Sequence, residues 1–154
     1  MSSTLIELPP ELQESDDSSS VEYVEATSVE EFAHETHIDD QSLLDRVLLP
    51  GREFGPYRIL GFIASGGMGE IYAAERKSGD GRKRRPVALK VIGEEHAHDW
   101  RIVERFKREA ALSQAIDSPN VIRVYEFGET DTGDAFLAME LLAGEELFAR
   151  LCRT

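Results

Sequence analysis

Six short apolar segments after residue 54 constrain the fold of this chain more than any other feature of its sequence. Their patterns predict three strands, then one helix, then two further strands. The predicted strands cover residues 57–63, 71–74, 87–92, 121–127 and 135–142, and the predicted helix covers residues 99–116. This order indicates an α+β fold, in which one main helix packs on a mostly antiparallel sheet of five strands.

The negative charge of the 154-residue chain is concentrated before these segments. Residues 1–50 hold 13 acidic residues and one basic residue, whereas residues 51–154 hold 17 acidic and 16 basic residues. We therefore expect an acidic, largely disordered tail over residues 1–50 and a folded domain over residues 51–154. Within the tail, apolar residues at helical spacing predict a short helix over residues 40–49. This helix either docks on the domain or a partner, or forms transiently in a linker.

Composition and charge exclude several classes of protein. An acidic chain without a dense basic face argues against a nucleic-acid partner. No apolar run reaches the roughly 18 residues that a membrane span needs, and the first residues lack the pattern of a secretory signal. The single cysteine, Cys152, excludes an internal disulfide and a cysteine-rich metal site, and no other metal site is expected. These features favour a cytoplasmic protein.

A glycine-rich turn, Ala-Ser-Gly-Gly-Met-Gly over residues 64–69, separates the first two predicted strands. Closely spaced glycines let the backbone approach phosphate oxygens, and the N–H groups of such a turn can point at an anion. The turn is not a Walker A loop, because no Gly-Lys-Ser/Thr closes it. Two alternatives stay open. One is a plain turn, and the other is a dinucleotide-binding turn followed by a helix, although that fold requires no lysine in the next strand.

Two charged residues lie inside apolar elements downstream of the turn. Lys90 interrupts the most apolar strand, and Glu109 shares a helix face with Phe106 and Ile116. Because burying an unpaired charge costs several kcal/mol, we expect a salt bridge between Lys90 and Glu109 that aims the ammonium group at an anion beneath the turn. The alternatives are a solvated Lys90 and an exposed ion pair between Glu109 and Arg105.

These features, in this order, resemble the N-terminal, ATP-binding lobe of the bacterial eukaryotic-like serine/threonine protein kinases. The resemblance covers residues 54–151 continuously. Its motifs are Gly-Gly-Met-Gly-Glu-Ile-Tyr (66–72), Val-Ala-Leu-Lys (87–90), Arg-Phe-Lys-Arg-Glu-Ala (105–110), Ser-Pro-Asn-Val-Ile-Arg-Val-Tyr (118–125) and Ala-Met-Glu-Leu-Leu-Ala-Gly (138–144). It implies a protein-kinase-like N-lobe and, in the family, ATP-dependent phosphoryl transfer to protein Ser or Thr with ATP and magnesium as cofactors.

The resemblance also implies roles for individual residues. Lys90 would contact the α- and β-phosphates and pair with Glu109, so these two are the catalytic candidates. Ala64 stands where the family has its first glycine. Met139 would be the gatekeeper, and the Glu140 carbonyl and Leu142 amide would bind the adenine edge. Together with Lys90, the nucleotide-binding candidates are Ile63, Ala64, Ser65, Gly66, Gly67, Met68, Gly69, Ile71, Ala88, Met139, Glu140 and Leu142.

The 154 residues contain neither the His-Arg-Asp nor the Asp-Phe-Gly motif of the family. We therefore expect a lobe truncated before the catalytic loop, without magnesium ligands and inactive alone. The alternative is a non-catalytic regulatory module that binds nucleotide or a partner. In either case, a kinase or another protein would cover the apolar residues that face the missing lobe. These residues are Met139, Leu141, Leu142, Leu147, Phe148 and Leu151.

Overall fold

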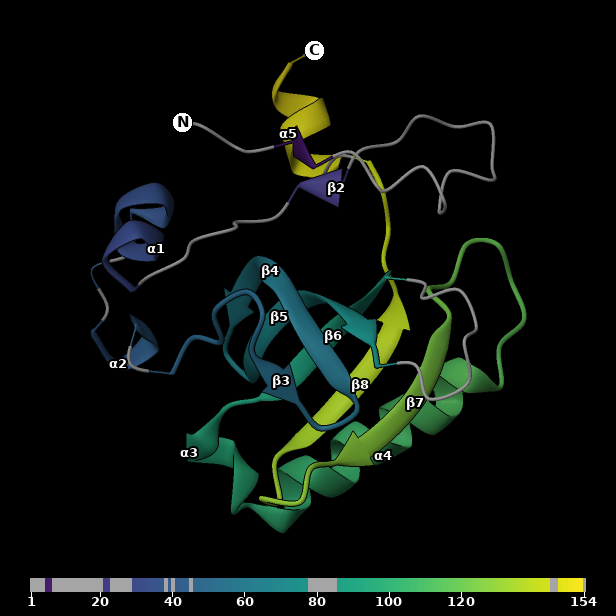
Figure 1. The fold of residues 1–154 in the computed structure, drawn as a ribbon. Coiled ribbons are helices and arrows are strands. Elements are labelled where there is room, and N and C mark those ends of the chain that lie inside the picture. The colour runs from purple at the N-terminus through teal and green to yellow at the C-terminus, as the bar shows by residue number, and fades with distance from the viewer. Residues whose placement is uncertain are drawn as a thin grey trace.

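The computed structural model describes residues 5–6, 21–22, 29–37, 39, 41–44, 46–77, 86–144 and 147–153. A six-stranded antiparallel sheet forms the centre of the fold, in the spatial order β3-β4-β5-β6-β8-β7 (Figure 1). Its strands are β3 (Glu53–Phe54), β4 (Tyr57–Gly66), β5 (Gly69–Arg76), β6 (Pro86–Ile92), β7 (Val124–Glu129) and β8 (Ala135–Glu140). A separate antiparallel pair joins β1 (Leu5–Ile6) to β2 (Val21–Glu22).

The α+β class and the antiparallel sheet are confirmed, and the sheet has one strand more than the sequence predicted. The additional strand is β3, which pairs with the start of β4 across a tight turn. A strand of two residues is too short to show alternation, so the apolar pattern carried no signal for it. The edge strand β3 is therefore an addition to the predicted sheet, and it leaves the order of the predicted strands unchanged.

The main helix of the domain is α4 (Trp100–Gln114), and it begins where the sequence predicted. Asp99 caps it, because its carboxylate accepts a 3.0 Å hydrogen bond from the Arg101 amide. The buried residues of α4 are Phe106 and Ala110, whereas Ile116 lies beyond the helix end and is exposed. The shorter helices are α1 (Val29–Thr36), α2 (Gln41–Leu44), α3 (Glu94–Ala97) and α5 (Leu147–Cys152). Within the described residues, every helix is too short or too polar to cross a lipid bilayer.

Strand register divides the sheet into two faces with different partners. Residues directly opposite each other share a face, so Ile71, Lys90 and Leu137 form one row across β5, β6 and β8. Ala88 and Met139 lie in the next row of the same face. Helix α4 packs against this face, and its contact is one apolar cluster of six buried residues. The cluster contains Ile92, Phe106, Ala110, Val124, Ala135 and Leu137.

The opposite face of the sheet packs against residues that precede it in the sequence. Tyr72, Leu89 and Ala138 form a row of this face and are almost fully buried. Their cluster includes four residues from the expected tail, namely Phe32, Leu44, Val47 and Leu48. The expectation of disorder is therefore wrong for residues 29–36, which form α1, because Phe32 finds an apolar partner in the sheet. Of residues 1–28, only those of β1 and β2 lie within the described part of the chain.

The short helix expected over residues 40–49 is present only in part. Helix α2 covers Gln41–Leu44, and Val47 and Leu48 follow it without helical structure. Both residues are nevertheless buried, so the segment docks on the domain. The spacing of the apolar residues predicted correctly that Val47 and Leu48 are buried. These two residues contact the sheet without forming the last turn of the predicted helix.

Candidate functional site

The glycine-rich turn connects β4 to β5 as a tight hairpin, with Gly66 opposite Gly69. Gly69 has φ +140°, and a Cβ atom there would overlap the carbonyl oxygen of Val91 in the neighbouring strand. A Cβ atom at Gly67 would have no atom within 4 Å. The end of the turn is therefore fixed against the sheet, whereas its tip is open and a ligand can approach the backbone there.

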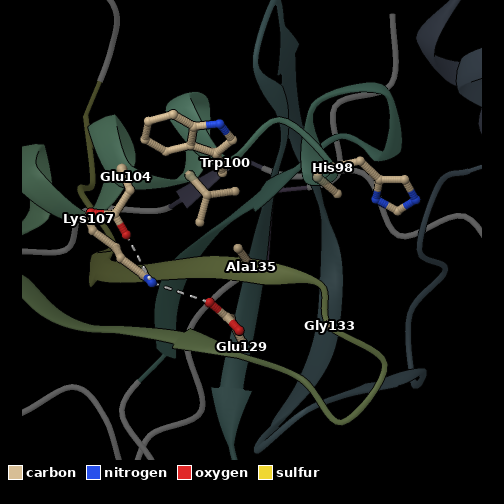
Figure 2. A pocket seen from close by; sticks show the side chains of 9 residues that line it. His98, Trp100, Glu104, Lys107, Glu129, Gly133 and Ala135 are labelled. Carbon is tan, nitrogen blue, oxygen red and sulfur yellow. Dashed lines mark hydrogen bonds and ion pairs between the residues drawn. The ribbon is translucent and has the colours of Figure 1, made fainter.

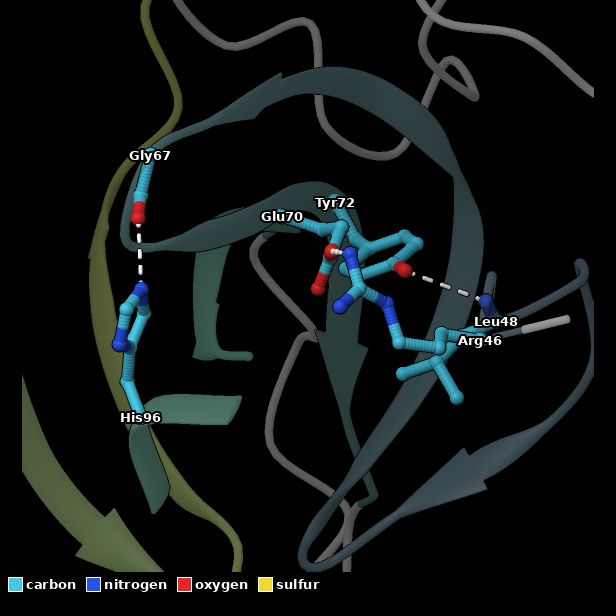
Figure 3. A network of polar contacts seen from close by, with 6 residues as sticks. All are labelled: Arg46, Leu48, Gly67, Glu70, Tyr72 and His96. Carbon is cyan, nitrogen blue, oxygen red and sulfur yellow. Dashed lines mark hydrogen bonds and ion pairs between the residues drawn. The ribbon is translucent and has the colours of Figure 1, made fainter. Parts of the chain in front are cut away.

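Two contacts from the segment after β6 hold the tip of the turn. The Gly93 amide donates a 3.2 Å hydrogen bond to the Met68 carbonyl. His96 of α3 donates from Nε2 to the Gly67 carbonyl at 2.8 Å (Figure 3). Sequence reasoning did not find this role of His96, because it depends on where α3 places the ring after β6. No local motif marks such a contact.

Lys90 lies in the middle of β6, partly buried, on the face that packs against α4. Its Nζ atom is 5.4 Å from the centre of the Phe106 ring, which is within the range of a cation–π contact. None of the described carboxylates pairs with this ammonium group. Lys90 therefore presents a positive charge beside Ile71, two residues after the glycine turn.

The salt bridge that the sequence predicted between Lys90 and Glu109 is not formed. Glu109 instead accepts a 3.1 Å hydrogen bond from Arg105 Nε, and its side chain is 51% exposed. This is the exposed alternative that the sequence left open. A pair four residues apart on a helix surface keeps both charges in water, whereas a bridge to β6 would require burying the carboxylate beside Phe106.

The structure brings several of the other candidates together. Ile71, Ala88 and Met139 lie on the same sheet face as Lys90, by the strand register. Ile63 and Ala64 lie at an irregularity of β4, where Ala64 pairs with Ile71. This row of small and aliphatic side chains runs from the glycine turn toward the end of β8. It makes an apolar surface in which Lys90 lies nearer the turn than Ala88 and Met139 do.

The end of β8 is tied to the segment before β7. The Glu140 amide donates a 2.8 Å hydrogen bond to the Arg123 carbonyl, and the Glu140 carboxylate accepts one from the Arg123 amide at 3.3 Å. These contacts fix the direction of the chain as it leaves the sheet. Leu142 follows in an irregular segment and is exposed. Of the hinge candidates, Glu140 is therefore held in place and Leu142 is accessible.

A second feature is a hollow of about 520 Å³ between α3, α4 and the turn that joins β7 to β8 (Figure 2). Trp100 and Lys107 line it, and the Lys107 ammonium group is bound to Glu104 at 3.4 Å and to Glu129 at 3.6 Å. None of the residues predicted to bind a ligand lines this hollow. The candidate site is the part of the Lys90 sheet face that lies beneath the glycine turn, beside α4.

Comparison with known proteins identifies the family. The family described as protein tyrosine and serine/threonine kinase matches residues 58–154. This chain belongs to that kinase family. The serine/threonine-protein kinase PknD of Mycobacterium tuberculosis is 36% identical over 107 residues, which are 70% of this chain and 15% of the relative. The serine/threonine-protein kinase pkn2 of Myxococcus xanthus is 44% identical over 105 residues, which are 68% of this chain and 11% of the relative.

A solved structure agrees with this assignment. The kinase domain of Mycobacterium tuberculosis PknI matches with a TM-score of 0.55 and 26% identity, over 70% of this chain and 41% of that domain. The N-lobe fold predicted from the sequence is confirmed. The chain thus spans less than half of a solved kinase domain and less than a fifth of these two curated relatives.

Proposed function

We propose that this chain is the ATP-binding part of a serine/threonine protein kinase, with the nucleotide beneath the glycine turn. The observation that carries this proposal is the strand register, which places Lys90 beside Ile71 and in line with Ala88 and Met139. An apolar row of this kind suits a planar base, and a cation at its end near an open glycine turn suits phosphate. Kinase relatives support ATP as the nucleotide.

The residues of the turn fit the phosphate end of ATP. A Cβ atom at Gly67 would have no atom within 4 Å, so phosphate oxygens can approach the backbone at this glycine. Lys90 adds a point charge that is not neutralised by a described carboxylate. ATP brings the negative charge that this face lacks. In the proposed complex Lys90 holds the α- and β-phosphates and the turn covers them.

The described residues fit ATP, but they do not form a comparable site for magnesium. No three His, Cys, Asp or Glu side chains gather as a metal-binding group in the described part of the chain. The family uses magnesium to neutralise phosphate charge and a separate base to orient the nucleophile. We therefore assign these residues the binding and orientation of ATP, and no chemical step.

The exposed apolar residues beyond β8 support a protein partner for this part of the chain. Leu142, Leu147, Phe148 and Leu151 are between 61% and 75% exposed, and the last three belong to α5. A group of large exposed apolar side chains favours a packed interface. We propose that they contact the C-terminal lobe of a kinase, supplied by the same or another polypeptide.

The test is a titration of the 154-residue polypeptide with ATP, followed by calorimetry. We expect weak binding, because the residues present supply only one side of a nucleotide pocket. Lys90→Met should weaken it at least about tenfold, since a charge-assisted contact to phosphate contributes about 1.5–3 kcal/mol. Lys77→Met is the matched control, because Lys77 pairs with Glu53 on the same sheet and lies away from the turn. Equal affinities of the two variants would overturn the proposed site.

A second assay distinguishes a polypeptide that only binds ATP from one that also transfers phosphate. The polypeptide is mixed with ATP, magnesium and a general protein substrate, and transferred phosphate is measured. We expect none above background from these residues alone, because they hold neither the base nor the metal ligands. Transfer that disappears in Lys90→Met would show that this chain is catalytic by itself. ATP binding without transfer supports the binding part that we propose.

A further inference from the structure

The described residues of segment 29–49, here called the N-terminal strap, cover the sheet face opposite the proposed nucleotide site. Phe32 of α1 is 1% exposed and packs edge-on against Phe62 of β4, with ring centres 4.9 Å apart. Leu44, Val47 and Leu48 continue the same contact. The strap precedes residue 58, where the match to the kinase family begins. It is therefore an addition to the part of the fold that the family match covers.

Two polar contacts join the strap to the beginning of β5 (Figure 3). Arg46 Nη2 lies 3.1 Å from Glu70 Oε1, and Glu70 is only 4% exposed. The Leu48 amide donates a 3.1 Å hydrogen bond to the Tyr72 hydroxyl. Arg46 and Leu48 thus reach the first and third residues after Gly69, which ends the glycine turn.

Strand alternation explains why the Arg46 contact is important to the turn. Gly69 and Ile71 belong to the nucleotide face, so Glu70 points to the strap face. A carboxylate buried there requires a cation, and Arg46 supplies it. Because Glu70 follows Gly69 directly in the chain and pairs with Ser65 next to the Gly66–Gly69 pair, a displacement of Glu70 would also displace the end of the turn. The turn is therefore held on one side by His96 and on the other by the strap.

We propose that Arg46 is a positioning residue of the glycine turn. Its ion pair with Glu70 restrains the β5 end of the turn, so docking of the strap sets the mobility of the turn and the affinity of the site for nucleotide. The effect on nucleotide rests on the proposed function, whereas the restraint of the turn does not. Strap release is thus a means of regulating the site from the face that ATP does not occupy.

Hydrogen exchange followed by mass spectrometry tests the restraint in the full chain without any ligand. In Arg46→Ala, the amides of residues 66–70 should exchange about tenfold faster, because the charge-assisted bond that closes this segment is lost. Arg58→Ala is the matched control, since it removes the Arg58–Glu75 pair between β4 and β5, the two strands that the turn connects. Unchanged exchange of the turn in Arg46→Ala, or equal acceleration in both variants, would overturn the proposal.

Two further variants separate positioning from general loss of structure. Arg46→Lys keeps the charge and should restore most of the slow exchange, and R46E combined with E70R should restore the pair in reverse. Arg46→Gln replaces Arg46→Ala if the alanine variant does not fold. Failure of both rescues, with thermal unfolding unchanged, would contradict a role of the ion pair.

ATP titration of the same variants connects the restraint to the site. Arg46→Ala should change the ATP dissociation constant at least threefold, and Arg46→Lys should reverse the change. If wild type binds no ATP, the proposed function fails while the exchange result still decides the role of Arg46. If the turn loosens and ATP affinity stays the same, the link to nucleotide is overturned.

Discussion

Arg105 and Glu109 form an ion pair across one turn of α4, with Nε and Oε1 3.1 Å apart, on the side of the helix that faces water. Lys90, the partner that the family resemblance implied for Glu109, instead directs its ammonium group at the Phe106 ring. In protein kinases the strand lysine and the helix glutamate must both be in place for catalysis. In the described arrangement the helix glutamate is therefore not engaged with the strand lysine of the proposed nucleotide site.

Glu109→Gln should leave both the stability and the ATP affinity of the chain almost unchanged. Exposed pairs four residues apart contribute about 0.3–0.5 kcal/mol, so the loss of unfolding free energy should stay below about 0.5 kcal/mol. ATP affinity should remain within about twofold of wild type, because Glu109 does not contact Lys90. Urea unfolding and calorimetry measure the two quantities. A loss of affinity as large as that in Lys90→Met would mean that nucleotide draws Glu109 to Lys90.

Gly69→Ala should destabilise the fold by at least about 2 kcal/mol. The added Cβ atom would overlap the Val91 carbonyl oxygen, and the positive φ adds backbone strain. Gly67→Ala is the matched control, because a Cβ atom there meets nothing within 4 Å and its cost should stay below about 1 kcal/mol. Urea unfolding compares the two variants. Equal losses would show that the end of the turn is not fixed against β6.

Phe32→Ala tests whether the N-terminal strap belongs to the folded core. Removing a fully buried phenylalanine costs about 3–5 kcal/mol, and Phe32 loses its edge-on contact with Phe62 as well. The control is Phe148→Ala, because Phe148 is exposed and its removal should change stability by less than about 0.5 kcal/mol. Thermal unfolding monitored by circular dichroism measures both. Equal melting temperatures of wild type and Phe32→Ala would place the strap outside the cooperative unit.

The sequence predicted the parts of the fold that depend on local patterns. The apolar runs located β4, β5, β6 and α4, and the Asp99 cap fixed the start of α4 within one residue. Residues that are buried only by tertiary contact were missed. Phe32 stands among polar residues without a periodic signal, and its burial follows from the sheet face that Phe62 and Tyr72 present. Such a face exists only after the strands have paired.

In the candidate site, too, some features were predictable from the sequence, whereas others depend on tertiary contacts. The family resemblance implied that Ile71 and Ala88 lie at the same site as Lys90, and the strand register of the structure places all three on one face. The partner of Glu109 was not predictable from helix spacing, because the choice between Lys90 and Arg105 depends on a rotamer and on solvation. Arg46 and Glu70, which are in contact, are 24 residues apart in the sequence, and His96 and Gly67 are 29 residues apart. No local motif predicts either contact.

Buried tyrosines should make this fold sensitive to alkaline pH. Burial raises the pKa of Tyr72 well above its ordinary value of about 10, and burial together with Glu126 does the same for Tyr57. In the unfolded chain both hydroxyls lose their protons near pH 10, whereas in the folded chain they keep them. The folded state therefore binds more protons above pH 10. The contribution of these two tyrosines to the free energy of unfolding is therefore fully present below pH 10 and is lost as the pH rises above it.

The expected slope is about 1.4 kcal/mol per pH unit for each of these tyrosines above pH 10, and Tyr72→Phe removes one of the two contributions. The variant should lose about 1–2 kcal/mol at neutral pH, since the Leu48 amide loses its acceptor, yet its stability should decline less steeply with pH. Urea unfolding at a series of pH values measures both effects. Tyr125→Phe, at an exposed position of β7, is the control and should keep the wild-type slope. If Tyr72→Phe keeps that slope too, the Tyr72 hydroxyl ionises as readily in the folded chain as in the unfolded one, and its contact with the strap does not shield it from water.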